Sequence, residues 1–128
     1  MFRISQYMEE IAHPTPLGPK RNPPGPVVIW NLIRRCNLTC KHCYSISADK
    51  DFPGELSTAE VFGVMDDLKR FHVPVLILSG GEPLLRPDIF DIAQRAKGLG
   101  FYVGLSSNGT LIDESNIRRI AETDFDYV

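Results

Sequence analysis

The stretch VPVLILSGGEPLLRPDIFDIAQRAKGLGFYVGLSSNG, residues 73–109, decides the fold of this protein. It contains two short apolar runs, residues 73–79 and 101–107, that are typical of buried strands. Between them, residues 86–100 predict a helix, with a proline near its start and a glycine at its end. A strand, a helix and a second strand in this order predict a parallel βαβ unit whose helix packs on one face of the sheet.

The same alternation continues in both directions along the chain. Upstream, VVIWNLI (27–33) predicts a buried strand, and a capping box of Ser57 and Glu60 begins a helix. Downstream, DESNIRRIAET (113–123) predicts a third helix, and FDYV (125–128) predicts the entry to a fourth strand. The predicted fold class is therefore α/β, with parallel strands and helices on one face of the sheet.

The first part of the chain has a different character. Residues 1–12 predict a short amphipathic helix, and HPTPLGPKRNPPGP (13–26), with six prolines and two glycines, predicts an extended connector. We therefore divide the chain into an N-terminal segment with its connector (1–26) and three strand–helix units with the start of a fourth strand (27–128). A (β/α) barrel needs about 250 residues, so we expect an incomplete barrel that is the N-terminal portion of a longer protein.

Composition and charge exclude several classes of partner. The 128 residues are 43% hydrophobic and 23% charged, with a formal net charge of −2 and no basic block. We therefore expect binding neither to nucleic acid nor to a membrane surface. The apolar runs are far shorter than a membrane span, and the N-terminus has no apolar signal core, so we predict a cytoplasmic protein.

All three cysteines lie in RRCNLTCKHCYS (34–45), with the spacing C-x3-C-x2-C. An odd number argues against a disulfide framework. Structural zinc takes four protein ligands, and His42 between two of the cysteines would have to fold back to become the fourth. A thioredoxin-like pair is also disfavoured, because Cys40 and Cys43 do not open a helix. A [4Fe–4S] cluster usually takes four thiolates, so three, with Cys36 the first, would leave one iron free for substrate or cofactor.

The cysteine stretch is one of three unusual stretches that follow the predicted strands. Residues 34–45 follow the first strand, SGGEPLLR (79–86) follows the second, and SSNG (106–109) follows the third. Ligand sites of parallel α/β sheets lie at the carboxyl ends of the strands. We therefore expect the three loops to meet in one site, where Arg34 and Arg35 either brace the cysteine loop, face an acidic substrate or lie on the surface.

CNLTCKHC (36–43), followed by GGEP (80–83) after the next strand, resembles the radical S-adenosylmethionine (SAM) superfamily. Its signature is C-x3-C-x-φ-C, where φ is usually aromatic, and His42 departs from tyrosine or phenylalanine while keeping a flat ring. The resemblance implies the N-terminal part of a partial (β/α)6 TIM-like radical SAM barrel with parallel strands. It also implies a [4Fe–4S] cluster and SAM as cofactors.

By this resemblance, Cys36, Cys40 and Cys43 are the metal ligands, and His42 lies at the cofactor. SAM would chelate the open iron through its amino and carboxylate groups. An electron from the cluster would then release a 5′-deoxyadenosyl radical that abstracts hydrogen from the substrate. No catalytic residue beyond the cluster and the SAM site is implied.

The two other loops carry the remaining predicted cofactor-binding residues. Gly80, Gly81 and Glu82 match the GGE motif of the superfamily, which contacts the methionyl amino group. The polar segment after the third strand, which faces SAM or substrate in the superfamily, is matched by Ser106, Ser107 and Asn108. Ordinary turns are the alternative interpretation of both loops.

Over residues 1–128 the sequence resembles the radical SAM enzymes of d-type heme biosynthesis, which serve cytochrome cd nitrite reductase in denitrification. This implies didecarboxysiroheme, a tetrapyrrole, as substrate and the removal of two of its propionate side chains. It also implies a low-potential electron donor such as ferredoxin or flavodoxin. Such enzymes usually carry a second cluster in a C-terminal extension, which these 128 residues do not include. The alternatives are another heme-pathway enzyme, a peptide-modifying maturase, or a non-catalytic metal-binding fragment.

Overall fold

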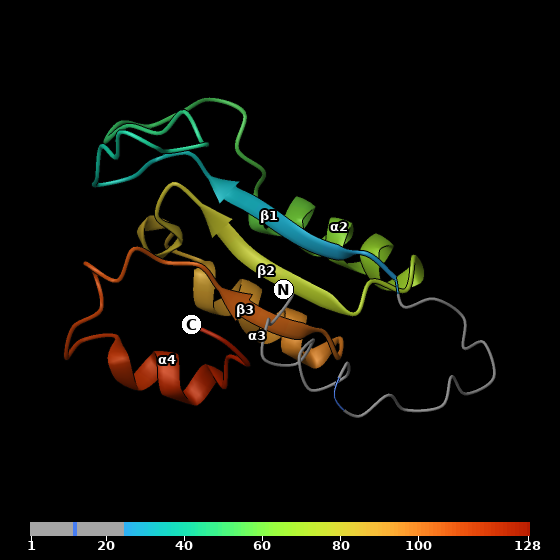
Figure 1. Cartoon of the computed structure of the whole chain (residues 1–128). Helices are drawn as coiled ribbons and strands as arrows, with labels where there is room; N and C mark the ends of the chain where they lie inside the picture. The colour runs from blue at the N-terminus through green and yellow to red at the C-terminus, as the bar shows by residue number, and fades with distance from the viewer. Residues whose placement is uncertain (1–11, 13–24) are drawn as a thin grey trace.

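The computed structural model describes Ala12 and residues 25–128 of the chain. The elements alternate in the predicted order: β1 (Val27–Ile33), α2 (Thr58–Arg70), β2 (Val75–Gly80), the 3₁₀ helix η1 (Pro83–Leu85), α3 (Ile89–Gly98), β3 (Tyr102–Leu105) and α4 (Ile117–Thr123) (Figure 1). The three strands form one parallel sheet in the order β1-β2-β3. The predicted α/β fold with parallel strands is therefore confirmed.

The register of the sheet places the carboxyl ends of the three strands side by side. Leu78 of β2 pairs with Trp30 of β1 on one side and with Leu105 of β3 on the other. The pairing of β1 with β2 shifts after Asn31, so that Ile33 lies opposite Gly80. The loops that follow the strands consequently leave the sheet from the same edge, where ligand sites of such folds lie.

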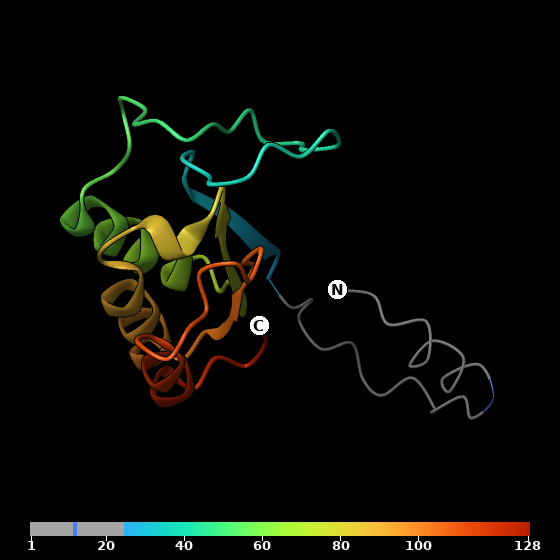
Figure 2. The ribbon, with the colours of Figure 1, turned by 90° about the vertical axis from the view of Figure 1, so that its left-hand side faces the viewer.

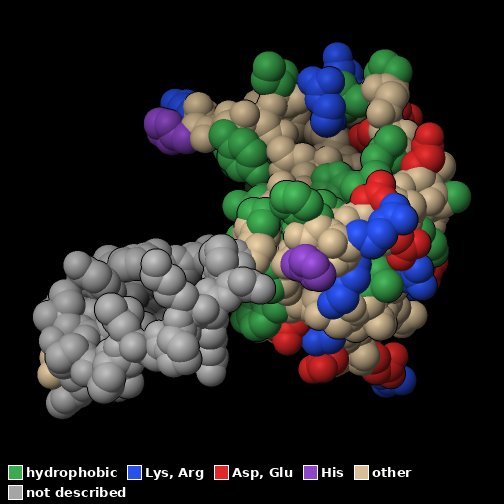
Figure 3. Space-filling model, turned by 90° about the vertical axis from the view of Figure 1, so that its right-hand side faces the viewer, with side chains coloured by type: hydrophobic (Ala, Val, Ile, Leu, Met, Phe, Trp, Pro, Cys, Tyr) green, Lys and Arg blue, Asp and Glu red, His purple; other side chains and the backbone are tan. Residues whose placement is uncertain are grey.

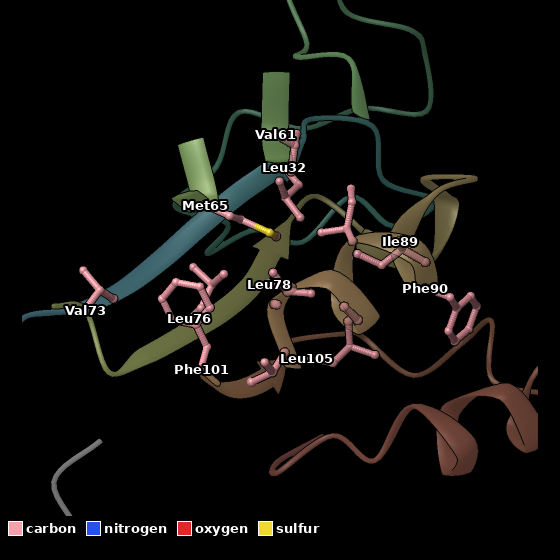
Figure 4. Close-up of a cluster of buried hydrophobic side chains, with 14 residues drawn as sticks. Leu32, Val61, Met65, Val73, Leu76, Leu78, Ile89, Phe90, Phe101 and Leu105 are labelled. Carbon is pink, nitrogen blue, oxygen red and sulfur yellow. The ribbon is translucent and has the colours of Figure 1, made fainter. Parts of the chain in front are cut away.

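Helices α2 and α3 cover one face of the sheet, and the hydrophobic core lies between them and the strands (Figure 2). In α2, Val61 and Met65 are four residues apart and therefore point from the same side of the helix toward the strands (Figure 4). The strands contribute alternate residues to the core, because successive side chains of a strand point to opposite faces. The core residues of the strands are Leu32, Leu76, Leu78, Val103 and Leu105.

The opposite face of β1 is open, which corrects one prediction. Residues 27–33 were expected to form a strand buried throughout, but Val27 is 49% exposed and Ile29 is 65% exposed. Their side chains point away from the helices, and among residues 25–128 no element covers them. Only Leu32 and Ile33, at the end of the strand, are buried.

The capping box at the start of α2 is confirmed. The hydroxyl of Ser57 accepts from the backbone N–H of Glu60, and the carboxylate of Glu60 accepts from the backbone N–H of Ser57. The hydrogen bond from the Ser57 side chain to this carboxylate, with the backbone one, lowers the pKa of Glu60. The cap therefore fixes the residue at which the long segment after β1 ends and α2 begins.

Helix α4 is shorter than predicted. The helix expected over residues 113–123 begins only at Ile117. Asp113 accepts hydrogen bonds from the N–H and hydroxyl of Ser115, and its own N–H donates to the side chain of Asn116. Such local side-chain bonds compete with helical backbone bonds, so residues 113–116 form a turn.

The last residues of the chain return to the sheet beside β3. Tyr127 forms an isolated parallel bridge with Gly104, at the place where the sequence predicts the entry to a fourth strand. Leu105 donates its N–H to the carbonyl of Tyr127 at 2.8 Å, and Asp126 donates to Val103 at 2.9 Å. The pairing is parallel, as the predicted βα repeat requires.

The segment predicted over residues 1–26 lies outside the described residues, apart from Ala12, Gly25 and Pro26. In the part of the chain that is described, none of the helices has the length and apolar character needed to cross a membrane. On the face seen in Figure 3, basic and acidic side chains are interspersed and no large patch of one sign gathers.

Candidate functional site

The three loops that follow the strands meet at one edge of the sheet, as the sequence predicts. We name them the cysteine loop (34–56), the GGE loop (80–82) and the β3 loop (106–110). Hydrogen bonds join loops that are far apart in the sequence. Glu82 N donates to Arg35 O at 2.9 Å, and Asn108 Nδ2 donates to Asn37 Oδ1 at 3.0 Å. The cysteine loop thus contacts both of its neighbours.

The two glycines of the GGE loop lie directly against the start of the cysteine loop. Gly80 has φ of 148°, and a Cβ atom there would lie 2.2 Å from the carbonyl oxygen of Ile33. At Gly81, a Cβ would lie 2.3 Å from the carbonyl oxygen of Arg35, which also accepts the N–H of Glu82 at 2.9 Å. Glycine is therefore required here by a close approach of two backbone segments. A role of these glycines toward SAM stays a prediction.

Glu82 is completely buried and joins the GGE loop to the β3 loop. Its carboxylate accepts from the hydroxyl of Ser107 at 2.9 Å, from Asn108 N at 2.8 Å and from Leu84 N at 2.9 Å. Among the described residues no cationic side chain forms an ion pair with it. The buried carboxylate is stabilised by hydrogen bonds alone, and its first effect is to fix the relative position of two loops.

The two predicted serines of the β3 loop have different surroundings. The backbone N–H of Ser106 extends the ladder to Leu78 O at 2.9 Å, and its side chain is exposed. Ser107 donates to Glu82 and accepts from Gly109 N at 3.0 Å. Ser107 therefore supports the loop itself, whereas Ser106 is free to face a ligand.

The cysteine loop holds its three thiols in two different environments. Cys36 is buried beneath the β3 loop, whereas Cys40 and Cys43 are exposed, and all three are free thiols. Cys43 N donates to Cys40 O at 3.2 Å, which closes a turn with His42 exposed inside it. The thiol of Cys43 lies 2.7 Å from the carbonyl oxygen of Ser45. Within residues 25–128 and Ala12, no three His, Cys, Asp or Glu side chains are gathered for a metal ion.

The donor set nevertheless suits an iron–sulfur cluster. Cys36, Cys40 and Cys43 lie on one loop at the ligand edge of the sheet, and none of them is used in a disulfide. The sulfur of Cys36 already accepts from the backbone N–H of Leu38 at 3.4 Å and from the amide of Asn108 at 3.8 Å. The thiolate is the form of cysteine that binds metal. Two thiols on an exposed turn would have to approach the third for the cluster to bind.

Charged side chains brace the ends of the cysteine loop. Arg35 donates to Asp49 at 2.9 Å and to Asp51 at 3.2 Å, and the hydrogen bond and charge of Asp49 raise its pKa. Alongside, Cys36 N donates to Ala48 O at 3.2 Å. Of the interpretations open from the sequence, the structure supports bracing for Arg35. The outgoing and returning segments of the loop are thus held together near the sheet. The turn that carries the exposed Cys40 and Cys43 lies farther from the sheet.

Tyr44 reaches back from the cysteine loop to the open face of the sheet. Its hydroxyl donates to Asn31 Oδ1 at 3.1 Å and lies 3.4 Å from the hydroxyl of Ser79. The sequence analysis missed Asn31 and Ser79. The available signal was that each is a polar residue near the carboxyl end of an otherwise apolar strand.

Arg86 is a buried structural residue beside the site that sequence reasoning missed. It donates to Leu32 O at 2.9 Å, to Leu56 O at 2.8 Å and to Asp88 at 2.7 Å. Burial raises the pKa of Asp88, but hydrogen bonds from Arg86 and Thr58 and the charge of Arg86 outweigh it, so the pKa is lowered. Arg86 thereby joins the end of β1, the return of the cysteine loop and the start of α3.

Comparison with known proteins agrees with this arrangement. A family model described as the radical SAM superfamily matches residues 30–128. The chain belongs to the radical SAM superfamily. Membership of the radical SAM superfamily implies SAM and an iron–sulfur cluster as cofactors, in keeping with the three thiols and the GGE loop at one edge of the sheet.

Two relatives and one solved structure illustrate the radical SAM similarity. The chain is 57% identical over 128 residues, all of its length, to pre-heme d1 synthase of Dinoroseobacter shibae, and spans 32% of that protein. It is 46% identical over 103 residues, 80% of its length, to Fe-coproporphyrin III synthase of Methanosarcina barkeri, spanning 26% of it. SuiB of Streptococcus suis, solved bound to S-adenosylmethionine, shares the fold with a TM-score of 0.64 and 20% identity, over 76% of this chain and 22% of SuiB. The chain thus spans about a third or less of the proteins it matches.

Proposed function

We propose that this chain is the cluster- and SAM-binding part of a NirJ-type radical SAM enzyme, which acts in d-type heme biosynthesis for denitrification. The observation that carries the proposal is the 57% identity to pre-heme d1 synthase along the whole chain. That match includes residues 1–29, which precede the part matched by the superfamily model. The proposed substrate is didecarboxysiroheme, and the proposed reaction removes two of its propionate side chains.

In this proposal, Cys36, Cys40 and Cys43 hold a [4Fe–4S] cluster. A cluster held by these thiolates would supply the electron for cleavage of SAM. Cys36 provides the preformed end of the site, because its backbone and its sulfur are both hydrogen bonded. Cys40 and Cys43 provide the adjustable end, on a turn that is exposed and therefore free to close.

The GGE and β3 loops form the proposed SAM side of the site. Gly80 and Gly81 keep the GGE loop close to the cysteine loop, so that a ligand of the cluster would also meet this loop. By the superfamily resemblance Glu82 is the proposed contact of the methionyl ammonium of SAM, and among the described residues it has no cationic partner. Ser106, with its exposed side chain, and His42, exposed beside the thiols, complete the proposed contacts.

The proposal extends to partners, location and domain organisation. The formal net charge of −2 and the lack of a basic block in the sequence fit a protein that binds neither nucleic acid nor membranes, and we propose a cytoplasmic location. A low-potential donor such as ferredoxin or flavodoxin would reduce the cluster. Residues 1–26 would form a separate segment ahead of an incomplete barrel over residues 27–128.

Anaerobic reconstitution with iron and sulfide tests the cluster and SAM sites. We expect a brown protein whose reduced form gives a [4Fe–4S] electron paramagnetic resonance signal that changes when SAM is added. Cys36→Ala should abolish this signal. The control Ser115→Ala, at an exposed residue far from the thiols in the sequence, should keep it. A colourless protein that retains zinc would support the non-catalytic metal-binding fragment instead.

The substrate is tested with the full-length enzyme. Reconstituted protein, SAM, a reductant and didecarboxysiroheme should yield a tetrapyrrole that has lost two propionate side chains, detected by mass spectrometry. The 46% identity to Fe-coproporphyrin III synthase favours a second candidate, another heme-pathway enzyme. A changed tetrapyrrole that retains both propionates would support that candidate and exclude the first.

A further inference from the structure

The side chain of Asn108 lies between the β3 loop and the first cysteine. Its Nδ2 donates to Asn37 Oδ1 at 3.0 Å and contacts Cys36 Sγ at 3.8 Å, within hydrogen-bonding range for sulfur. Cys36 is 72 positions away in the sequence. Cys36 is buried whereas Asn108 is exposed, so the contact between them is partly buried.

The orientation of the Asn108 amide is determined by its other partners. Its Oδ1 accepts from the backbone N–H of Thr110 at 2.9 Å and from the Thr110 hydroxyl at 2.7 Å. A backbone N–H can only donate, so the oxygen end must face Thr110 and the NH₂ end must face the sulfur. The backbone of Asn108 is also fixed, because its N–H donates to the buried carboxylate of Glu82 at 2.8 Å.

An N–H donor aimed at a cysteine sulfur has a known physical effect on a bound cluster. It withdraws electron density from the sulfur and stabilises the more negative, reduced state. Hydrogen bonds to the sulfurs are among the features that set cluster potentials, and partners in the outer shell typically change metal affinity or activity by about 10–100-fold. Cys40 and Cys43 are exposed, and no asparagine or glutamine side chain contacts their sulfurs among the described residues.

We propose that Asn108 is a positioning residue for Cys36, whose side-chain amide hydrogen bonds the sulfur and raises the reduction potential of the cluster bound there. The proposal rests on the proposed function, because it requires that Cys36 is a cluster ligand. It assigns Asn108 to the cluster, in addition to the contact with SAM or substrate that the superfamily resemblance implies. The β3 loop would then influence the reduction potential of a cluster whose cysteine ligands follow β1.

The test compares Asn108→Ala and Asn108→Thr with the parent in the reconstituted full-length protein without SAM. Both variants are uncharged, so a shift in potential cannot come from an added charge. We expect the ratio of reduced to oxidised cluster, measured by paramagnetic resonance at a set potential, to fall about tenfold, equivalent to about 59 mV for a one-electron couple. At least one of the two variants should contain as much iron per chain as the parent, which shows that its cluster is fully loaded when the potential is measured.

The matched control is Asn116→Ala. Asn116 also donates its side-chain amide, to Leu111 O at 2.6 Å, but makes no contact with a cysteine, so the potential should not move. A loaded Asn108 variant that titrates at the parent potential would overturn the proposal. Loss of cluster uptake in both Asn108 variants, with normal uptake in Asn116→Ala, would also overturn it and leave Asn108 a purely structural residue. If the parent itself takes up no cluster, the proposed function fails instead.

Discussion

The cysteine loop and the GGE loop lie side by side and are built in opposite ways. The GGE loop is short. Its buried carboxylate accepts three hydrogen bonds, and its two glycines lie against the neighbouring backbone. The cysteine loop is long, and beyond its braced base, where Arg35 pairs with Asp49, its thiol-bearing turn is exposed.

The difference separates a preformed half of the site from an adjustable half. Loops with few buried contacts open at low free-energy cost, whereas buried, hydrogen-bonded segments do not. We infer that the GGE and β3 loops hold their shape without cofactors, and that the turn of Cys40 and Cys43 is ordered by the cluster. The following substitutions test this contrast, beginning with the largest expected effect.

Glu82→Ala should break the preformed half. Removal of the carboxylate leaves the buried donors of Leu84, Ser107 and Asn108 without their acceptor, so the free energy of unfolding should fall by about 3 kcal/mol. Urea denaturation measures the loss. The exposed Glu122→Ala serves as the control and should stay within about 0.5 kcal/mol of the parent; equal effects of the two substitutions would contradict the contrast.

Gly81→Ala should push the two loops apart. The added Cβ would lie 2.3 Å from the carbonyl oxygen of Arg35, a backbone atom that cannot rotate away, so we expect a loss of about 2 kcal/mol. Gly63→Ala in α2 meets nothing within 4 Å and should stabilise the helix by about 1 kcal/mol. A Gly81 variant as stable as the parent would show that the loop gives way easily.

Asp88→Asn should weaken the junction around Arg86 in a pH-dependent way. The pKa of Asp88 is lowered in the folded protein, so its stabilisation is present above the ordinary aspartate pKa of about 3.9 and is lost as the pH falls below it. We expect the variant to be less stable than the parent by about 1 kcal/mol near neutral pH. The two unfolding curves should converge in acid, and a constant difference at every pH would refute the charge-based explanation.

Arg35→Ala should have the smallest effect and should be confined to the cysteine loop. Arg35 and its partner Asp49 are exposed, and exposed ion pairs contribute little to global stability. The urea midpoint should therefore not change, whereas tryptic cleavage at Lys41 and Lys50 should accelerate by about twofold as the base of the loop loosens. Unchanged cleavage rates would mean that the backbone bond of Cys36 to Ala48 holds the base alone.

Several elements followed from local sequence patterns alone. The bounds of β1 agree with the prediction, and the Ser57–Glu60 capping box starts α2 at the predicted place. These signals are local: a short apolar run rich in β-branched residues and a cap. Helix α4 was predicted four residues too long, because the side chains of Asp113 and Asn116 bond the backbone locally, an alternative that a helical pattern does not reveal.

The predicted site residues were brought to one edge, but their contacts were beyond the reach of the sequence. Glu82 is a fully buried link to Ser107 and Asn108, and nothing in GGEP indicates a partner 25 positions away. Arg86 was passed over because a buried arginine and a surface arginine look the same in a sequence. The open face of β1 was also missed, since a strand rich in valine and isoleucine gives no sign of which face another element covers.

The sequence by itself determined the α/β alternation, the three thiols with their spacing, and the loops that would carry the site. These depend on side-chain type and on short-range order along the chain. The tertiary structure alone decided that Asn108 lies against Cys36, that glycine is required at Gly80 and Gly81, and that Glu82 joins the GGE loop to the β3 loop. Those properties arise from the parallel register of the sheet, which places residues from distant strands within hydrogen-bonding distance, and no local pattern encodes that distance.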